Sequence, residues 1–392
     1  MKIELSELKG IDRLGINTDS MLFSNDGQLM LLIVKTKTDD RNFMLFDNTY
    51  NRNTEKWEWV LRPRSFSSKN EFNKNSSVTL SGNGEYIVIL SVLNKIGFIS
   101  KLITYKTRNF EYDIQILGEN KPKEKGAIKY KNSSILISAN SDRLIMGLPM
   151  NNLINLLEHH TTGSIFNDNM KSTWIIKDTM KGNELSKYYA CHISASNNLD
   201  VLTVCSSEDN GVVFIYQRNK EGDYILDKKI DASNNGLTSL GLVSRVSKDG
   251  TFISYAYYNR PNRYETSVEH SIYKKIDNEW ILLKHFTEGG YYRCKLYHEL
   301  DIQISEDNTK VLLCNSSDRY ICDAYVVDIT DNKKPIMKNI YLDSDIEDVL
   351  MLEDLIKFRF RFKYQNNKLV GLLTGRLLNN DKRNKIFTIN DE

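Results

Sequence analysis

One hairpin-like pattern recurs along this chain. An apolar stretch ends in a serine, a short turn rich in Gly, Asn and Asp follows, and a second apolar stretch begins, as in VTLSGNGEYIVIL at 78–90. The serines that end the first stretch are Ser24, Ser81, Ser138, Ser194, Ser247 and Ser305. Their spacings are 57, 57, 56, 53 and 58 residues, and seven units of about 56 residues fill a chain of 392. The chain is therefore expected to fold as a repeat.

Each unit is expected to contain four short strands. After the turn and the second apolar run come a polar loop, a third apolar stretch and a fourth stretch that carries an aromatic residue, such as KWEWVLR at 56–62 and STWIIKD at 172–178. β-Branched and aromatic runs separated by Gly, Asn and Asp turns are typical of antiparallel sheets. In the third unit the segment NNLINLLEHH at 151–160 shows helical periodicity, so a short helical insertion is predicted there, with the third strand at GSIFND, 163–168.

Repeated four-stranded units predict an all-β fold, a seven-bladed β-propeller of four-stranded antiparallel blades, as one domain over residues 1–392. A seventh unit is expected at 358–375, but it lacks a fourth strand, and KIELSEL at 2–8 is left over. The N-terminal strand is therefore predicted to join the last blade and close the ring. The expected blades span roughly 14–64, 74–120, 130–180, 187–232, 238–288, 298–342, and 355–392 with 2–8.

The unit resembles the repeats of β-propeller proteins, FG-GAP-like or WD-like in general outline. The segment from Ile193-Ser194 through Gly211-Val-Val-Phe-Ile-Tyr216 carries this likeness. The Asp-x-Asp-x-Asp-Gly calcium loop of many FG-GAP repeats is missing, because SNDGQ and SKDGT carry a single aspartate at that place. The GH and WD pairs of WD repeats and the double glycines of kelch repeats are missing as well. The resemblance implies the propeller fold and no particular family's function.

Composition and charge restrict the classes of partner. Hydrophobic residues make up 40% and charged residues 27% of the chain, which is typical of a soluble globular protein. The net charge of +2 argues against a nucleic-acid partner, since such proteins cluster cations against phosphates. The N-terminus does not resemble a signal peptide, and no apolar run is long enough to span a bilayer. Five cysteines without CxxC spacing are expected to be reduced, and a cytoplasmic location is predicted.

The sequence shows no catalytic motif, and no catalytic residue, cofactor or metal is predicted. GxSxG, Walker, GxGxxG, HxH and HExxH patterns are all missing. One alternative stays open: His160, His270 and His298 could converge at the channel mouth with Glu158, Glu269 or Glu299. His192 occupies an alternating position of an innermost strand and is expected to lie in the core or to line the channel.

The most individual loops are expected on one face of the ring, opposite the serine turns. Long loops carry function more often than framework does, and Tyr and Arg are enriched at protein interfaces. The candidate interaction surface consists of His159, His160, Arg260, Arg263, Tyr264, Tyr291, Tyr292, Tyr297 and His298.

The predicted function is a non-enzymatic protein–protein interaction scaffold, a subunit of a larger assembly. A composition rich in Lys, Asn and Ile is typical of an AT-rich genome, so a virion or other structural-complex component is the specific version of this prediction. Two alternatives stay open: a propeller enzyme, hydrolase or lyase, acting at the channel mouth, and a propeller that binds carbohydrate or another ligand.

Overall fold

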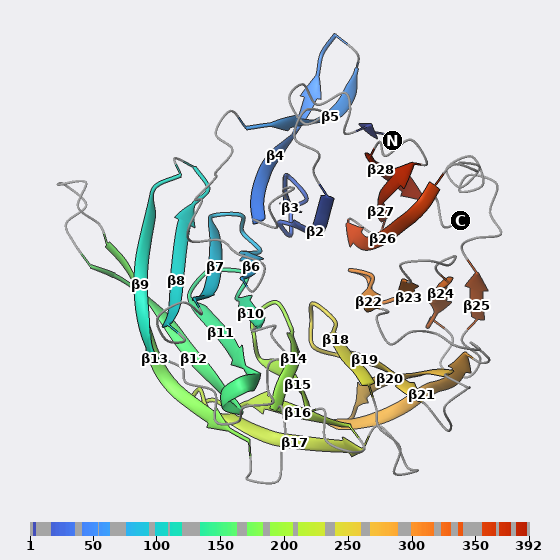
Figure 1. Ribbon diagram of the computed structural model, residues 1–392. Coiled ribbons are helices and arrows are strands. Elements are labelled where there is room, and N and C mark those ends of the chain that lie inside the picture. The colour runs from blue at the N-terminus through green and yellow to red at the C-terminus, as the bar shows by residue number, and fades with distance from the viewer. Residues whose placement is uncertain are drawn as a thin grey trace.

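The computed structural model is a ring of four-stranded antiparallel sheets arranged as the blades of a β-propeller (Figure 1). It describes residues 3–4, 17–35, 41–53, 55–62, 76–93, 99–108, 110–119, 134–162, 171–182, 189–206, 211–231, 240–259, 267–288, 299–316, 323–330, 336–339, 355–365, 368–377 and 382–389. Within these residues, no helix is long and apolar enough to cross a membrane.

Six blades are each built from four consecutive strands. Blades 1 to 3 contain β2 (Asn17–Phe23), β3 (Leu29–Lys35), β4 (Arg41–Asn51), β5 (Lys56–Leu61), β6 (Ser77–Leu80), β7 (Tyr86–Leu93), β8 (Ile99–Lys106), β9 (Tyr112–Glu119), β10 (Ser134–Ile137), β11 (Arg143–Leu148), β12 (Leu153–Thr162) and β13 (Lys171–Lys181). Blades 4 to 6 contain β14 (Tyr189–Ala195), β15 (Val201–Ser206), β16 (Val212–Arg218), β17 (Tyr224–Asp231), β18 (Leu240–Val246), β19 (Phe252–Asn259), β20 (Ser267–Ile276), β21 (Glu279–Glu288), β22 (Glu299–Ile304), β23 (Lys310–Ser316), β24 (Asp323–Asp328) and β25 (Ile336–Asn339).

The remaining sheet joins the two ends of the chain. It consists of β26 (Leu355–Gln365), β27 (Lys368–Leu377), β28 (Lys382–Ile389) and the two-residue β1 (Ile3–Glu4), which pairs with β28. Ile3 lies opposite Ile386, and Glu4 lies opposite Lys385. The prediction of a seven-bladed propeller therefore needs correction: six blades are complete four-stranded sheets, each from one stretch of chain. The last sheet has three strands plus a two-residue fourth strand, and the predicted pairing of the N-terminal strand with this sheet is confirmed.

The apolar core lies between the blades, so the inner strands are buried on both faces. All six residues of β15 are buried, for example. In blade 3, Leu157 packs toward blade 2 with Leu90 and Leu102, whereas its neighbour Leu156 packs toward blade 4 with Leu202. Stacking against two neighbours replaces the in–out alternation of a half-exposed sheet with continuous apolar runs.

This double burial explains one wrong prediction. The segment 151–160 is not a helical insertion: β12 (Leu153–Thr162) is the third strand of blade 3, and only a 3₁₀ turn at Pro149–Asn151 precedes it. Leucines at positions 153, 156 and 157 imitate a helical face, but they serve the two faces of one buried strand. The predicted third strand at 163–168 is wrong for the same reason, and those residues lie outside the described ones.

The marker serines close the turn between the first and second strands. Their hydroxyl oxygens accept a hydrogen bond from the backbone N–H five residues later: Leu29 to Ser24 (3.0 Å), Tyr86 to Ser81 (2.9 Å), Arg143 to Ser138 (3.0 Å), Val201 to Ser196 (3.1 Å), Phe252 to Ser247 (2.9 Å) and Lys310 to Ser305 (2.8 Å). In blade 4 the serine that closes the turn is thus Ser196, not the predicted Ser194. The hydroxyl of Ser194 instead accepts from Val246 N–H of the next blade.

Neighbouring serine turns are joined by backbone hydrogen bonds into a continuous chain. Asn25 N–H donates to Gly82 O (2.7 Å), Asn83 N–H to Ala139 O (2.7 Å), Ala139 N–H to Asn197 O (2.8 Å), and Asn197 N–H to Lys248 O (2.8 Å). A Cβ on Gly82 would approach Ala139 Cα to 2.9 Å, so glycine is required for this close contact. The turns therefore align blades 1 to 5 at one face of the ring.

We predict that Ser138→Ala lowers the free energy of unfolding by about 1–2 kcal/mol, because two partly buried backbone N–H groups lose their acceptor. These donors are Asp142 N–H and Arg143 N–H. Ser134→Ala on the same hairpin is the matched control, since the buried Ser134 hydroxyl has no hydrogen-bond partner within the described part of the chain. Urea unfolding of both variants measures the difference, and equal effects would contradict a role for the serine in the turn.

Deletion of residues 1–9 is expected to lower the melting temperature, because it removes β1 from the edge of β28 and opens the ring closure. Removal of residues 391–392, which follow β28, is the control truncation. Differential scanning calorimetry compares the three proteins. A deletion variant that melts at the temperature of the full chain would show that the β1–β28 pairing contributes nothing to stability.

Candidate interaction surface

Most residues of the predicted interaction surface lie outside the described residues. This holds for Arg260, Arg263, Tyr264, Tyr291, Tyr292, Tyr297 and His298, so their placement on one face stays a prediction. The other two, His159 and His160, lie on β12 near the serine turn of their blade, since His159 N–H donates to Asp142 O (2.8 Å). Their predicted position among the loops of the opposite face is therefore wrong, because the segment forms a strand.

His159 is part of the packing between blades 2 and 3. Its ring stacks on Trp174 with centroids 4.6 Å apart and meets the edge of Tyr86 at 5.2 Å. Burial is the larger cause of a lowered pKa of His159, and the charge of the neighbouring His160 lowers it further. Only His160 of this pair is exposed. The stacked imidazole supports the interface between two blades, and it does not present a free face to a partner.

The predicted alternative of convergent histidines and glutamates is not found among the residues that the structure describes. His270 is buried in blade 5, stacked on Phe286 at 5.0 Å, whereas His160 is exposed on blade 3. Within the described ranges, no group of three or more His, Cys, Asp or Glu residues could hold a metal ion. His298 lies outside those ranges, and the side chain of Glu299 is not described.

Blade 5 contains a serine, a histidine and a glutamate in series. Ser271 Oγ lies 2.9 Å from His285 Nδ1, and His285 Nε2 lies 3.3 Å from Glu269 Oε2. The Glu269 carboxylate also accepts hydrogen bonds from Thr287 Oγ1 (2.6 Å) and Ser267 Oγ (3.2 Å). This order of groups is that of a serine-hydrolase triad, but with the two imidazole nitrogens exchanged, since in the triad the serine contacts Nε2 and the carboxylate contacts Nδ1. The motif search missed it, because the three residues are adjacent only across the β20–β21 pair.

The triad-like cluster lacks an accessible nucleophile. Ser271 is 2% exposed, whereas a nucleophile must reach the carbonyl carbon of its substrate. Tyr255 and Tyr257, on the neighbouring strand β19, pack toward blade 4 within the apolar core. Burial, and then the charge of Glu269, raises the pKa of Tyr257 to about 12. The cluster therefore satisfies a buried carboxylate at a blade interface, and its role is structural.

His192 lies on β14, the innermost strand of blade 4, as the sequence analysis expects. Its Nδ1 accepts from Ser244 N–H of blade 5 at 3.4 Å. Burial, with a contribution from the positive charge of Arg245, lowers the pKa of His192 to about 3. The imidazole is therefore neutral in the folded protein at neutral pH, and it acts as a hydrogen-bond acceptor between two blades.

We predict that His192→Gln reduces the loss of stability on acidification. In the unfolded chain the imidazole takes up a proton near pH 6.5, whereas in the folded chain it stays neutral to about pH 3, so falling pH favours unfolding. Between pH 7 and 5 the wild type should lose roughly 1–2 kcal/mol more than the variant. Urea unfolding at each pH measures this difference. Parallel pH profiles would contradict the assignment of His192 as a group that stays neutral in the folded protein.

Exposed apolar side chains gather on the outermost strands. Of the described large apolar residues that are exposed, all except Tyr50 lie on the fourth strand of a blade: Val60, Tyr112, Ile114, Ile116, Ile175, Ile176, Ile225, Leu226, Ile281 and Leu282. In blades 3, 4 and 5 they form equivalent pairs, Ile175-Ile176, Ile225-Leu226 and Ile281-Leu282, each 43–56% exposed. We name these six residues the outer apolar belt.

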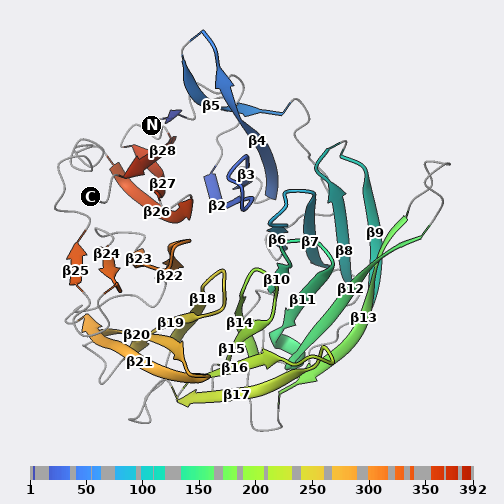
Figure 2. The same cartoon turned by 180° about the vertical axis from the view of Figure 1, so that it is seen from behind.

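The belt follows from the shape of the ring. Figures 1 and 2 both show β13, β17 and β21 in succession along the rim, where the blades diverge from the central axis. A bulge on the outer strand, at Lys177, Asp227 and Leu283, follows each belt pair directly. The residue before each pair, Trp174, Tyr224 or Trp280, turns inward, and Trp280 Nε1 donates to Asp227 Oδ2 of blade 4 at 2.9 Å. The aromatic residue fixes the strand, and the belt pair remains in solvent.

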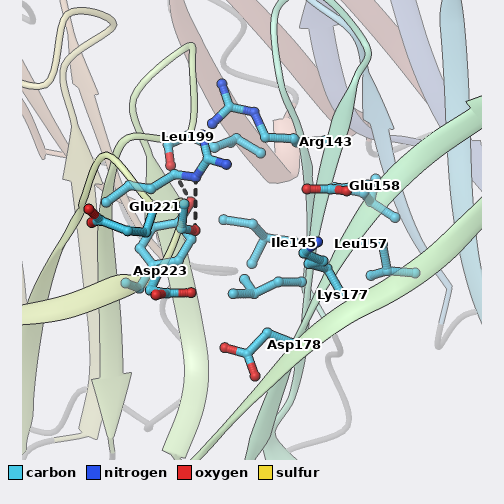
Figure 3. A pocket seen from close by; sticks show the side chains of 14 residues that line it. Arg143, Ile145, Leu157, Glu158, Lys177, Asp178, Leu199, Glu221 and Asp223 are labelled. Carbon is cyan, nitrogen blue, oxygen red and sulfur yellow. Dashed lines mark hydrogen bonds between the residues drawn. The ribbon is translucent and has the colours of Figure 1, made fainter.

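A pocket lies between blades 3 and 4, beside the belt (Figure 3). Its walls are Ile145, Leu156, Leu157, Glu158, Lys177 and Asp178 from blade 3, and Leu199, Arg218, Glu221, Asp223 and Tyr224 from blade 4, with Arg143 at its edge. The Tyr224 hydroxyl donates to Leu199 O, and burial raises the pKa of this phenol, so it stays protonated. The pocket therefore combines an apolar interior with a charged rim.

The charges of the rim are only partly compensated within the structure. Arg143 pairs with Asp200 (3.2 Å) and Asp142 (3.3 Å). Arg218 Nε donates to Gly222 O (3.0 Å), which holds it against the hairpin of its own blade. Among the described residues, Glu158, Asp178, Glu221 and Asp223 form no ion pair. Carboxylates without a cationic partner thus stand on both walls.

The sequence carried a signal for the belt. The fourth stretches read WVL at 59–61, WII at 174–176, YIL at 224–226 and WIL at 280–282. An aromatic residue followed by two aliphatic ones in equivalent places indicates a special position, but which of the three faces solvent depends on the neighbouring blade. The pocket carried no such signal, because its walls come from two different blades.

The comparisons with known proteins agree with the fold and go no further. A putative 6-phosphogluconolactonase from Bacteroides fragilis is 11% identical, with a TM-score of 0.54 and coverage of 82% of each chain. The Cps50 (Swd1) β-propeller domain of Myceliophteria thermophila is 10% identical, with a TM-score of 0.50 and coverage of 96% of this chain and 100% of that one. A structure of KlAtg21 with the coiled-coil of AgAtg16 is 12% identical, with a TM-score of 0.51 and coverage of 91% and 94%.

No protein-family model matches the chain, and no curated protein matches it in sequence. The chain is a β-propeller, similar in its fold to WD-like propellers as well as to propellers described as lactonases. At 10–12% identity these likenesses concern the fold alone.

Proposed function

We propose that this β-propeller is a non-enzymatic protein-interaction scaffold and a subunit of a larger assembly. The observation that carries the proposal is the outer apolar belt: six exposed aliphatic residues in equivalent places on three successive blades. Apolar patches of this kind on a folded surface mark interaction sites, because their burial against a partner is favourable.

One of the similar structures is consistent with such a role by its printed description, a complex of KlAtg21 with the coiled-coil of AgAtg16. The proposal includes a second contact face on the long loops, formed by Arg260, Arg263, Tyr264, Tyr291, Tyr292, Tyr297 and His298. A cytoplasmic assembly or a virion is the setting that we propose. The lactonase descriptions support the enzyme alternative only through the fold, and Ser271, the one triad-like serine of the described residues, is buried.

The triple variant Ile175→Thr, Ile225→Thr, Ile281→Thr tests the scaffold role. Threonine keeps the β-branched shape that suits a strand, and these positions are exposed, so the fold should tolerate the changes. We expect partners that the immobilised wild-type chain captures from an extract of its source to be depleted at least about tenfold with the variant, since the apolar contact is lost. Quantitative mass spectrometry measures the depletion.

The matched control is Val60→Thr, Ile114→Thr, Ile116→Thr, which removes exposed aliphatic residues from the outer strands of blades 1 and 2. It should retain the partners. Equal recovery with the belt variant and the wild type, or no stoichiometric partner with the wild type, would contradict the proposal. Turnover of gluconolactone by the purified wild type would favour the enzyme alternative.

A further inference from the structure

We infer that the pocket between blades 3 and 4 docks a short extended segment of a partner protein, in which apolar side chains are flanked by lysine or arginine. This inference rests on the proposed scaffold role, and it adds the place of contact and the chemistry of the partner segment. It is independent of the long loops, whose residues lie outside the described ones.

The interior of the pocket suits an apolar side chain. Ile145 and Leu156, whose side chains face blade 4, line it from blade 3, and Leu199 and the ring of Tyr224 line it from blade 4. The one hydroxyl among these four residues is already used, because Tyr224 donates to Leu199 O. A polar group packed against these side chains would lose water without a new hydrogen bond, whereas an aliphatic group would gain by burial.

The rim selects for positive charge. Figure 3 shows Glu158 and Asp178 extending from blade 3 toward blade 4, and Asp223 stands on the opposite wall. These three carboxylates form no ion pair among the described residues. Three cations line the pocket as well: Arg143 is compensated by Asp142 and Asp200, Arg218 is tied to the Gly222 carbonyl, and Lys177 is outnumbered by the carboxylates Glu158, Asp178, Glu221 and Asp223. Basic side chains of a ligand would therefore find carboxylates on both walls.

The outer apolar belt extends the pocket in both directions. Ile175 and Ile176 directly precede the lining residues Lys177 and Asp178 on β13, and Ile225 and Leu226 directly follow the lining residue Tyr224 on β17. All four belt residues are at least 43% exposed. A segment seated in the pocket thus continues onto apolar surface on each side, which favours an extended chain over a compact small molecule.

Three fluorescein-labelled nonapeptides test the inference with the full chain by fluorescence anisotropy. The first has three leucines flanked on each side by three lysines, the second has glutamates in place of the lysines, and the third has serines in place of the leucines. We expect the first peptide to bind at least about tenfold more tightly than the other two, because it alone satisfies both the rim and the interior.

The pocket variant Glu158→Gln with Asp223→Asn removes one carboxylate from each wall without changing side-chain size. It should weaken the first peptide by about fivefold or more, since two charge contacts are lost. The matched control is Asp277→Asn with Glu279→Gln, two exposed carboxylates at the equivalent hairpin of blade 5, and it should leave binding unchanged within about twofold. A photoreactive leucine in the peptide should crosslink to residues 171–181 or 219–228.

Three results would overturn the inference: no binding of the first peptide, equal or tighter binding of the glutamate peptide, or equal affinity of the pocket and control variants. Its failure is distinguishable from failure of the scaffold role. If the belt variant loses partners from the extract while the lysine–leucine peptide does not bind the wild type, the scaffold role stands and the docking site is wrong. If the peptide binds at the pocket but the belt variant retains all partners, the docking site stands and the scaffold role of the belt is wrong.

Discussion

The structure depends on the burial of each four-stranded sheet between two others. A sheet of this size has two apolar faces, and the radial arrangement covers both of them with neighbouring blades. The clusters that join blade 2 to blade 3, blade 3 to blade 4 and blade 4 to blade 5 are accordingly contributed by both members of each pair. The serine turns reinforce this packing at one face, where backbone hydrogen bonds pass from turn to turn.

The same geometry determines where the ring exposes apolar surface. Blades are in close contact near the axis and diverge toward the rim, so the outer strands are the part that neighbours cover least. Aromatic residues such as Trp174 bridge the blades below the rim: its Nε1 donates to Thr104 Oγ1 (2.9 Å), and its carbonyl accepts from Gln115 Nε2 (2.6 Å). The aliphatic residues that follow stay in solvent. The buried aromatic residue and the exposed aliphatic residues are therefore direct neighbours along the strand.

Polar groups inside the ring serve the packing. The Ser271–His285–Glu269 series and the neutral His192 each satisfy hydrogen bonds at a blade interface, where an unpaired polar group would cost stability. The resemblance of the series to catalytic groups arises because the buried Glu269 carboxylate requires hydrogen-bond partners, one of which is the half-exposed His285. Access distinguishes the two cases, and Ser271 has almost none.

Much of the fold could be predicted from the sequence, because the period of the repeat and the turn chemistry are local properties. The serine hydroxyl accepts from a backbone N–H five residues later, and the residue three positions after the serine has a left-handed conformation. In three of the turns this residue is a glycine: Gly27, Gly84 and Gly250. The misassigned Ser194 and the strand mistaken for a helix at 151–160 lie where burial by a neighbouring blade overrides the local pattern. Of the candidate surface, the sequence predicted His159 and His160 on the wrong face and did not indicate the pocket.

The sequence by itself determined a repeating all-β ring and the composition of its turns, since both follow from residues close together in the chain. Only the tertiary structure decided which apolar residues are covered. Ile175 and Ile176 remain exposed, whereas Leu156 and Leu157 are buried, although all four are aliphatic strand residues of one blade. The reason is their distance from the axis of the ring, which depends on how the blades are stacked. The pocket likewise depends on this stacking, because its two walls come from separate blades.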